Sequence, residues 1–479
     1  MTYAFYFDSG SCTGCKACQA ACKDKNNLPT GVLWRRVYEV SGGEWTRTGE
    51  AWTNTVFAYN LSIACNHCVH PKCAGVCPAD AYEVRPDGIV LINTQKCIGC
   101  GYCAWACPYD APQVDKSAGV MTKCNLCFDY LDNGHPPACV AACPLRCLEL
   151  VDIDDKRVDE MGQALWKIPG IEHPFPLPAL SRTEPHLVIR PHPGLKLVGK
   201  SSKVSNREET SPSQPKVTAS DEIPLIIFTL LVQMAIGAFG AVFFINLGFH
   251  DIQIAMQWTF IPFLAVGTAT AFALIVSLFH LKSPKNAWRV LNHLRKSWLS
   301  REILFTLGFA GLWAIQAGQR ISLTRPCSGE IILGLLTFIC GLVALYSMQR
   351  VYQLRSMPGW NSIRTLVEFT ISTIGLGCWL TGALLPSNVP SGIVAWLALA
   401  GILAFSASLL ISFIYPELEN KSLRNWQSGL LLAGIVGGAS VFLWSREVWM
   451  AGWFVVLIIA FAEETIGRWL FYLRRTPGI

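Results

Sequence analysis

The sequence predicts two parts of different fold class, an α+β domain rich in cysteine followed by an all-α membrane domain. Only 15% of the 479 residues are charged, against about 25% in a typical soluble domain. Residues 1–222 hold 46 charged side chains and residues 223–479 hold 26, while 17 of the 20 cysteines lie between Cys12 and Cys147. These distributions exclude a single uniform domain, a disordered chain and a small disulfide-linked secreted module.

The cysteines of the first part form four groups with similar spacing. In chain order the groups are Cys12, Cys15, Cys18 and Cys22; Cys65, Cys68, Cys73 and Cys77; Cys97, Cys100, Cys103 and Cys107; and Cys124, Cys127, Cys139 and Cys143. The first and third groups follow the C-x2-C-x2-C-x3-C run of bacterial ferredoxins. Three thiolates on one tight loop reach three irons of a cubane, and the fourth points toward a neighbouring cluster. We therefore predict four [4Fe–4S] clusters, with Cys147 left over.

Zinc and disulfides are the competing interpretations of these cysteines. Structural zinc uses two pairs of ligands for each ion and needs no third cysteine at regular spacing. Disulfides between residues three apart have poor geometry. The spacing favours iron and sulfur over both.

Short β-like segments precede several of the cysteine groups, at residues 3–7, 56–63 and 88–92. A strand that leads into a cysteine loop and a short helix is the repeat we expect. We assign residues 1–195 to this ferredoxin-like repeat domain. Residues 196–222 are rich in Ser, Lys, Glu and Pro, which is the composition of a flexible linker.

Residues 223–479 predict eight transmembrane helices. Most of the apolar stretches approach the ~20 residues that cross a bilayer, and they lie near 223–247, 257–280, 300–319, 329–349, 366–385, 391–414, 429–445 and 448–472. Thirteen Lys and Arg residues lie in the loops on the side of the cysteine-rich domain, and three lie on the other side. Positively charged loops stay in the cytoplasm, so we expect the cysteine-rich domain there. The first eight residues show no export signal.

Charged residues inside membrane helices are costly and are functional candidates. His280 ends the second span, Glu302 begins the third, and Glu463 and Glu464 lie inside the eighth, with Arg468 one turn beyond Glu464. A structural ion pair between Glu464 and Arg468 is the simpler interpretation of those two residues. A membrane haem generally needs two axial histidines from helices, and of the nine histidines only His280 lies near a span. We therefore expect no haem.

The two parts resemble two subunits of the dimethyl sulfoxide reductase family. Residues 1 to about 194 resemble its iron–sulfur subunit through the cysteine groups and the segments 62–68, 97–100, 121–124 and 143–146. Residues 223–479 are similar to its membrane-anchor subunit through segments 280–284, 300–302, 350–352, 358–360 and 464–468. The two subunits are normally separate, and here they are fused.

The resemblance implies which cysteines share a cluster. The implied sets are Cys12, Cys15, Cys18 and Cys143; Cys22, Cys124, Cys127 and Cys139; Cys65, Cys68, Cys73 and Cys107; and Cys77, Cys97, Cys100 and Cys103. Related nitrate reductase subunits have tryptophan at the position of Cys100 and a three-iron cluster, so a four-iron cluster is implied here. The resemblance also implies a menaquinol site near His280 and Glu302.

The function implied is electron transfer and membrane anchoring for a molybdopterin oxidoreductase. A separate catalytic subunit carries the bis-pterin molybdenum or tungsten cofactor, so we assign no catalytic residue to this chain and expect no nucleic-acid partner. The expected partners are that subunit, the lipid bilayer and quinone or quinol. A cytoplasmic dehydrogenase, for example of sulfite, that reduces quinone is an alternative. A cluster-driven ion-translocating module, suggested by Glu368, Glu463 and Glu464, is a second alternative.

Overall fold

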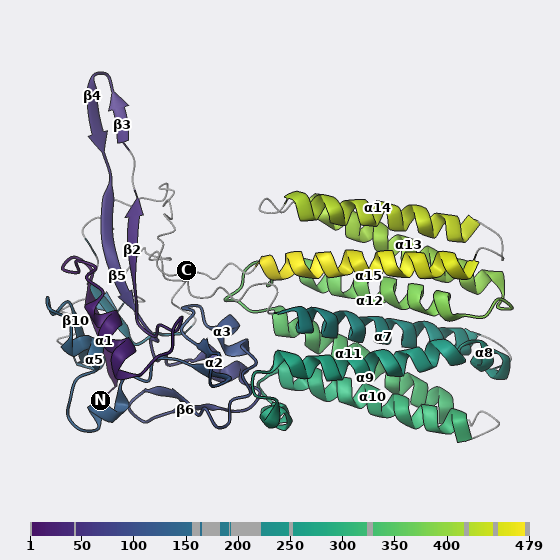
Figure 1. Ribbon diagram of the computed structural model, residues 1–479, viewed down its shortest axis with the longest axis horizontal. Coiled ribbons are helices and arrows are strands. Elements are labelled where there is room, and N and C mark those ends of the chain that lie inside the picture. The colour runs from purple at the N-terminus through teal and green to yellow at the C-terminus, as the bar shows by residue number, and fades with distance from the viewer. Residues whose placement is uncertain are drawn as a thin grey trace. The chain divides into compact units, whose positions relative to one another are not determined.

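The computed structural model describes residues 2–42, 45–155, 163–164, 183–190, 192, 222–248, 252–322, 329–415, 421–443 and 449–474. The chain divides into two compact units, Met1–Lys216 and Val217–Thr476, called here the cysteine-rich unit and the helical unit (Figure 1). Apart from Glu222, the segment 196–222 that we predict to be a linker lies outside the described residues.

A four-stranded sheet ties the two ends of the cysteine-rich unit together. Strand β1 (Tyr3–Asp8) pairs antiparallel with β10 (Leu148–Asp152) and parallel with β12 (Leu187–Arg190), and the two-residue strand β11 (Gln163–Ala164) lies at the edge. Alternate residues of β1 point to opposite faces, so Phe5 and Phe7 enter the core that contains the buried cysteines. Strand β1 therefore contributes two large aromatic side chains to this core.

The predicted order of strand, cysteine loop and helix is present four times. The elements that follow β1 in this pattern are α1 (Ala17–Lys25), β5 (Phe57–Ile63) with α2 (Lys72–Val76), β7 (Val90–Ile92) with α3 (Tyr102–Ala106), and β9 (Val120–Thr122) with α4 (Phe128–Leu131) and α5 (Ala138–Ala141). Strands β6 (Tyr82–Val84) and β8 (Gln113–Asp115) complete two short hairpins with β7 and β9. Each cysteine loop is thus held between regular elements.

A long β-hairpin was not predicted. Strand β2 (Arg36–Gly42) pairs with β5, and the shorter strands β3 (Trp45–Thr48) and β4 (Ala51–Asn54) pair with each other at the projecting end of the hairpin (Figure 1). Every residue of β3 and β4 is exposed. The exposed strands lack the apolar alternation by which a half-buried strand is recognised in a sequence.

Eight helices longer than twenty residues lie in the described part of the helical unit. They are α7 (Ile223–Gly248), α9 (Phe260–His280), α10 (Trp298–Ser322), α11 (Gly329–Tyr352), α12 (Ile363–Leu384), α13 (Ser391–Ile414), α14 (Lys421–Leu443) and α15 (Trp449–Leu473). Six of them, all except α10 and α15, are long and apolar enough to cross a membrane by length and composition. Two short helices, α8 (Ile252–Trp258) and the 3-10 helix η5 (Pro284–Leu291), were not predicted.

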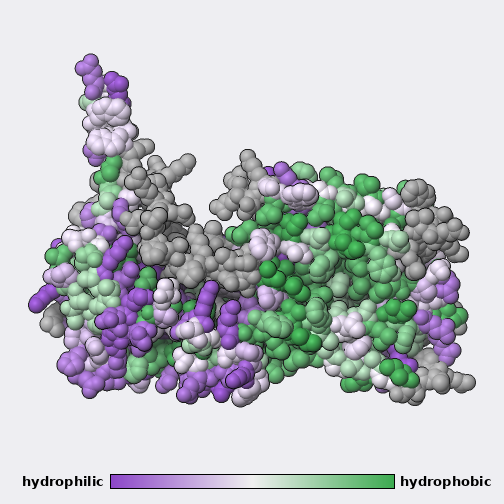
Figure 2. All heavy atoms as spheres, viewed as in Figure 1, coloured by the Kyte–Doolittle hydropathy of each residue, from purple (hydrophilic) through white to green (hydrophobic). Residues whose placement is uncertain are grey.

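The surface of the helical unit is largely apolar on the face shown in Figure 2. Large side chains such as Phe279, Ile332 and Phe413 are 63–72% exposed. A soluble monomer rarely exposes so much contiguous apolar surface, whereas a lipid-facing helix does so normally. The helical unit is therefore a membrane domain.

Helix α7 is the centre of this domain and packs against α9, α11, α12 and α15. Two glycines allow its close crossing with α12. A Cβ added to Gly237 would lie 1.8 Å from the Thr373 carbonyl oxygen, and one added to Gly377 would lie 2.2 Å from the Gly237 carbonyl carbon. Small residues let membrane helices approach in this way.

Candidate cofactor sites

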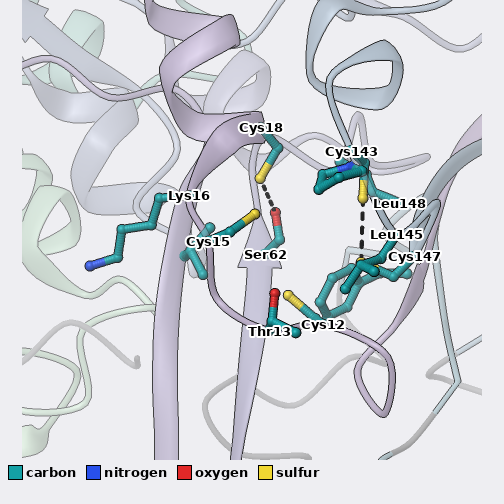
Figure 3. Close-up of a pocket in the computed structure, with 13 residues that line it drawn as sticks. Cys12, Thr13, Cys15, Lys16, Cys18, Ser62, Cys143, Leu145, Cys147 and Leu148 are labelled. Atoms are coloured by element: carbon teal, nitrogen blue, oxygen red, sulfur yellow. Dashed lines mark hydrogen bonds between the residues drawn. The ribbon is translucent and has the colours of Figure 1, made fainter.

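Five cysteines line one open hollow of about 340 Å³ in the cysteine-rich unit. Cys12, Cys15 and Cys18 come from the loop before α1 and its first turn, and Cys143 and Cys147 come from the turn between α5 and β10 (Figure 3). The Cys18 thiol lies 3.4 Å from the Ser62 hydroxyl. The first and last cysteine groups of the sequence thus meet at one place.

Two more hollows are each lined by four cysteines. One contains Cys65, Cys68, Cys73 and Cys107. The other contains Cys77, Cys97, Cys100 and Cys103. In both, three cysteines belong to one group and the fourth belongs to the other, because the last cysteine of each group lies beyond a short helix.

The remaining four cysteines lie near one another where α1 packs against α5. Cys22 is within electrostatic range of Cys139 and Cys127, and Cys124 is within range of Cys22 and Cys139. Burial raises the pKa of Cys22 to about 12, and burial likewise raises the pKa of Cys100 to about 12. Such thiols stay protonated at neutral pH unless a metal ion replaces the proton, as it does when a thiolate is coordinated.

Backbone amides of the cysteine loops point at sulfur atoms. The amides of Gly99 and Met121 both donate to Cys97 Sγ at 3.4 Å, and the Leu126 amide donates to Cys124 Sγ at 3.4 Å. Hydrogen bonds of this kind stabilise a negatively charged cluster and influence its reduction potential. The chemistry of the thiols and their surroundings therefore fits iron–sulfur clusters.

Two buried cations among the cysteines were missed by the sequence reasoning. The Arg35 side chain is 1% exposed and lies within electrostatic range of Cys18, Cys22, Cys124 and Cys139. Its Nη1 donates to the Ser62 hydroxyl at 3.2 Å, while Nε and Nη2 have no hydrogen-bond partner among the described residues. Lys123 is 4% exposed and lines the second hollow. A buried cation with unsatisfied donors is costly alone, so Arg35 fits an anionic group beside it. Lys123 Nζ donates to the carbonyl oxygens of Val90 and Cys124, so Lys123 contributes a buried positive charge whose hydrogen bonds go to the backbone.

Polar contacts in the helical unit involve His280, the last residue of α9, and Glu302, on α10. His280 Nδ1 lies 3.6 Å from Glu222 Oε2, just before α7. The Tyr352 hydroxyl lies 2.6 Å from the Tyr472 hydroxyl. Glu302 is 2% exposed, and both it and Glu222 lie within electrostatic range of Tyr352. The structure thus places Glu222 beside His280 and Tyr352 within electrostatic range of Glu302. The sequence reasoning missed Glu222, Tyr352 and Tyr472.

Arg468 and Glu464 on α15 form a network that lies within electrostatic range of the Tyr352–Tyr472 pair. Arg468 Nη2 donates to Gln233 Oε1 at 2.7 Å, and its guanidinium carbon lies 3.5 Å from the centre of the Phe369 ring. Glu464 accepts a hydrogen bond from the Ser372 hydroxyl at 2.7 Å, and it is within electrostatic range of Arg468. These contacts connect α15 with α7 and α12, which is a structural role.

Cysteine-rich loops around hollows and an apolar helical unit together define a membrane-anchored iron–sulfur protein. Comparisons with known proteins agree with this description. A family model described as a 4Fe-4S dicluster domain matches residues 56–153, and one described as the DMSO reductase anchor subunit matches residues 217–428.

Similar proteins cover the first part of the chain. The B polypeptide of anaerobic dimethyl sulfoxide reductase from Haemophilus influenzae is 46% identical over 201 residues, which are 42% of this chain and 94% of that protein. The Escherichia coli protein of the same name is 45% identical over 40% of this chain and 89% of its own length. The B component of sulfite dehydrogenase from Allochromatium vinosum is 36% identical over 32% of this chain and 69% of its own length. The chain belongs to the dimethyl sulfoxide reductase family, with the iron–sulfur and anchor parts fused.

Proposed function

We propose that this chain passes electrons between membrane quinol and a separate molybdopterin-containing catalytic subunit, and anchors that subunit to the membrane. The observation that carries the proposal is the presence, in one chain, of grouped cysteines in one unit and a polar group containing His280 in an apolar helical unit. The anchor-subunit match to residues 217–428 supports the second half.

Four [4Fe–4S] clusters bind the sixteen cysteines in the four sets that the family resemblance implies. Three hollows support this assignment, since each is lined by all four cysteines of one set. The mutual electrostatic range of Cys22, Cys124 and Cys139 supports the last set. When bound, the clusters supply one-electron transfer; the chain provides thiolates, amide donors and the buried cations Arg35 and Lys123.

Quinol binds beside His280 and Glu302. Quinol oxidation releases two electrons and two protons, and His280 and Glu222, whose Nδ1 and Oε2 atoms lie 3.6 Å apart, offer polar groups to a bound quinol. Glu302 and the Tyr352–Tyr472 pair offer further hydrogen-bonding groups. With no haem in the pathway, electrons pass directly between quinone and a cluster.

The membrane domain has eight spans, and the cysteine-rich unit faces the cytoplasm. The basic residues of the loops on that side support this orientation. The bis-pterin cofactor belongs to the partner subunit.

The same complex run in reverse is the second candidate. A cytoplasm-facing dehydrogenase would send electrons from its substrate through the clusters to quinone. The 36% identity to a protein named as a component of sulfite dehydrogenase supports this second candidate. Two reactions of the purified complex distinguish the directions of electron flow: a reducible substrate supplied with quinol, and an oxidisable substrate supplied with quinone. The products of each reaction show which direction the complex supports.

Iron analysis of the purified chain tests the cluster assignment. The proposal predicts about sixteen iron atoms per chain, because each cubane holds about four, and Cys15→Ala lowers the value by about four. Cys340→Ala is the matched control and keeps the wild-type value, because Cys340 lies on α11 and its thiol donates to the Phe305 carbonyl oxygen at 3.3 Å. A wild-type value near eight contradicts the proposal.

Quinol oxidation by membranes tests the quinone site. We expect His280→Gln to lower quinol-linked turnover at least tenfold while the iron content stays at the wild-type value. The control His293→Gln changes a histidine between η5 and α10 and leaves turnover unchanged. Wild-type turnover in His280→Gln would sink the assignment of this site.

A further inference from the structure

The first proposed iron–sulfur site contains five thiols, one more than the four irons of a cubane can bind. Cys147 lines the same hollow as Cys12, Cys15, Cys18 and Cys143, and its Sγ lies 3.4 Å from Cys143 Sγ (Figure 3). Its thiol also interacts with that of Cys12. The spacing of the sequence leaves Cys147 without a role, but the fold directs its sulfur to the cluster site.

The four-stranded sheet holds the backbone of Cys147. The Cys147 carbonyl oxygen accepts a hydrogen bond of 2.8 Å from the Asp8 amide, and the next residue, Leu148, pairs with Phe7 in the sheet. Cys147 is 5% exposed. Cys143 is partly exposed and lies in the turn that follows α5. The backbone of Cys147 is therefore held by the sheet, whereas that of Cys143 is held in the turn, where its amide donates to the Val140 carbonyl oxygen at 3.2 Å.

We propose that Cys147 is a working member of the first iron–sulfur site: its thiol donates a hydrogen bond to the Cys143 sulfur, and its own sulfur binds the same iron corner when Cys143 is absent. This inference rests on the proposed function, since it requires a cluster on Cys12, Cys15, Cys18 and Cys143. It adds a fifth residue to that site and gives Cys147 a role there.

Both roles of Cys147, as hydrogen-bond donor and as replacement ligand, follow from the short distance between its sulfur and that of Cys143. Two sulfurs 3.4 Å apart serve one corner, so one binds iron as a thiolate and the other remains a thiol that donates to it. A donor to a ligand sulfur favours the reduced, more negative cluster and raises its potential. When Cys147 replaces Cys143, an S–Fe bond forms, the thiol proton goes to solvent, and no electron is transferred.

Iron content tests the replacement. The variants are Cys143→Ala, Cys147→Ala and the double variant, each in the full chain purified from membranes, with Cys15→Ala as the comparison. We expect both single variants to keep about sixteen iron atoms and the double variant to lose about four. A loss of about four atoms in Cys143→Ala alone overturns the proposal.

Redox titration followed by electron paramagnetic resonance tests the hydrogen bond. Cys147→Ala lowers the midpoint potential of one cluster, and Cys147→Ser, which keeps an O–H donor, restores it toward the wild-type value. Unchanged potentials in Cys147→Ala overturn the proposal. These failures are distinguishable from failure of the proposed function, because a wild-type chain without about sixteen iron atoms fails the function itself.

Discussion

Arg35 shows what a single residue contributes to the cysteine-rich unit. Its guanidinium is buried among four cysteines, stacks 4.2 Å from the centre of the Phe5 ring and donates to Ser62. In the proposed cluster assignment, a cation in this position balances the charge of the neighbouring clusters. It also links strand β1 to the cysteine loops, so its removal affects both redox behaviour and stability.

Substitution of Arg35 tests this role. Arg35→Gln lowers the midpoint potential of at least one cluster, since a positive charge that favours the reduced state is lost. It also destabilises the unit by roughly 3–5 kcal/mol, as loss of one partner from a buried charge pair does. Potentiometric titration and thermal bleaching of the cluster absorbance measure the two effects. Arg47→Gln, on the exposed strand β3, is the control and changes neither; equal effects in both variants would contradict this role.

His186 makes the cysteine-rich unit sensitive to acid. The side chain is 6% exposed, and burial lowers its pKa below the ordinary value of 6.5. The folded state thus keeps the ring neutral while the unfolded state takes up a proton as the pH falls through about 6.5, so stability is lost below that pH. We expect the bleaching temperature to fall between pH 7.5 and 5.5, and to fall less in His186→Gln. An identical pH dependence in both proteins would refute this.

At the scale of elements, the crossing of α7 and α12 depends on glycine. A methyl group at Gly237 meets the Thr373 backbone oxygen, whereas nothing lies within 4 Å of a Cβ at Gly311 on α10. Gly237→Ala therefore destabilises the helical unit by about 1–3 kcal/mol or more through overpacking. Gly311→Ala is neutral or stabilising by up to about 1 kcal/mol, because alanine is the better helix former. Thermal denaturation in detergent compares them, and equal stability of the two variants would disprove a tight crossing.

The elements also show which features a sequence reveals. The predicted apolar stretches coincide with the eight long helices of the described residues, of which six are apolar enough to cross a membrane. Helix α14 begins at Lys421 and not at 429, because a helix continues past its apolar part. Cysteine spacing located the four loops. Arg35 and Cys147 have no periodic pattern around them, and Glu222 lies in a segment with linker composition. Their roles depend on contacts between distant parts of the chain.

At the scale of the whole molecule, the two units are stabilised by different means. Many of the cysteines are part of the buried core of the cysteine-rich unit, so on the proposed assignment the removal of iron leaves polar thiols in that core. The helical unit is stabilised by helix packing. Extraction of iron with a chelator is expected to melt the cysteine-rich unit while the helical circular dichroism of the other unit persists. Simultaneous loss of both signals would contradict independent stabilisation.

Electron exchange between quinone and the clusters is the central claim and is measured most directly in membranes that contain the complete complex. The clusters are first reduced with dithionite and observed by electron paramagnetic resonance, and a soluble menaquinone analogue is then added. We predict that the wild-type clusters are reoxidised by the quinone and that those of His280→Gln remain reduced. Wild-type clusters that stay reduced in the presence of excess quinone would contradict this claim.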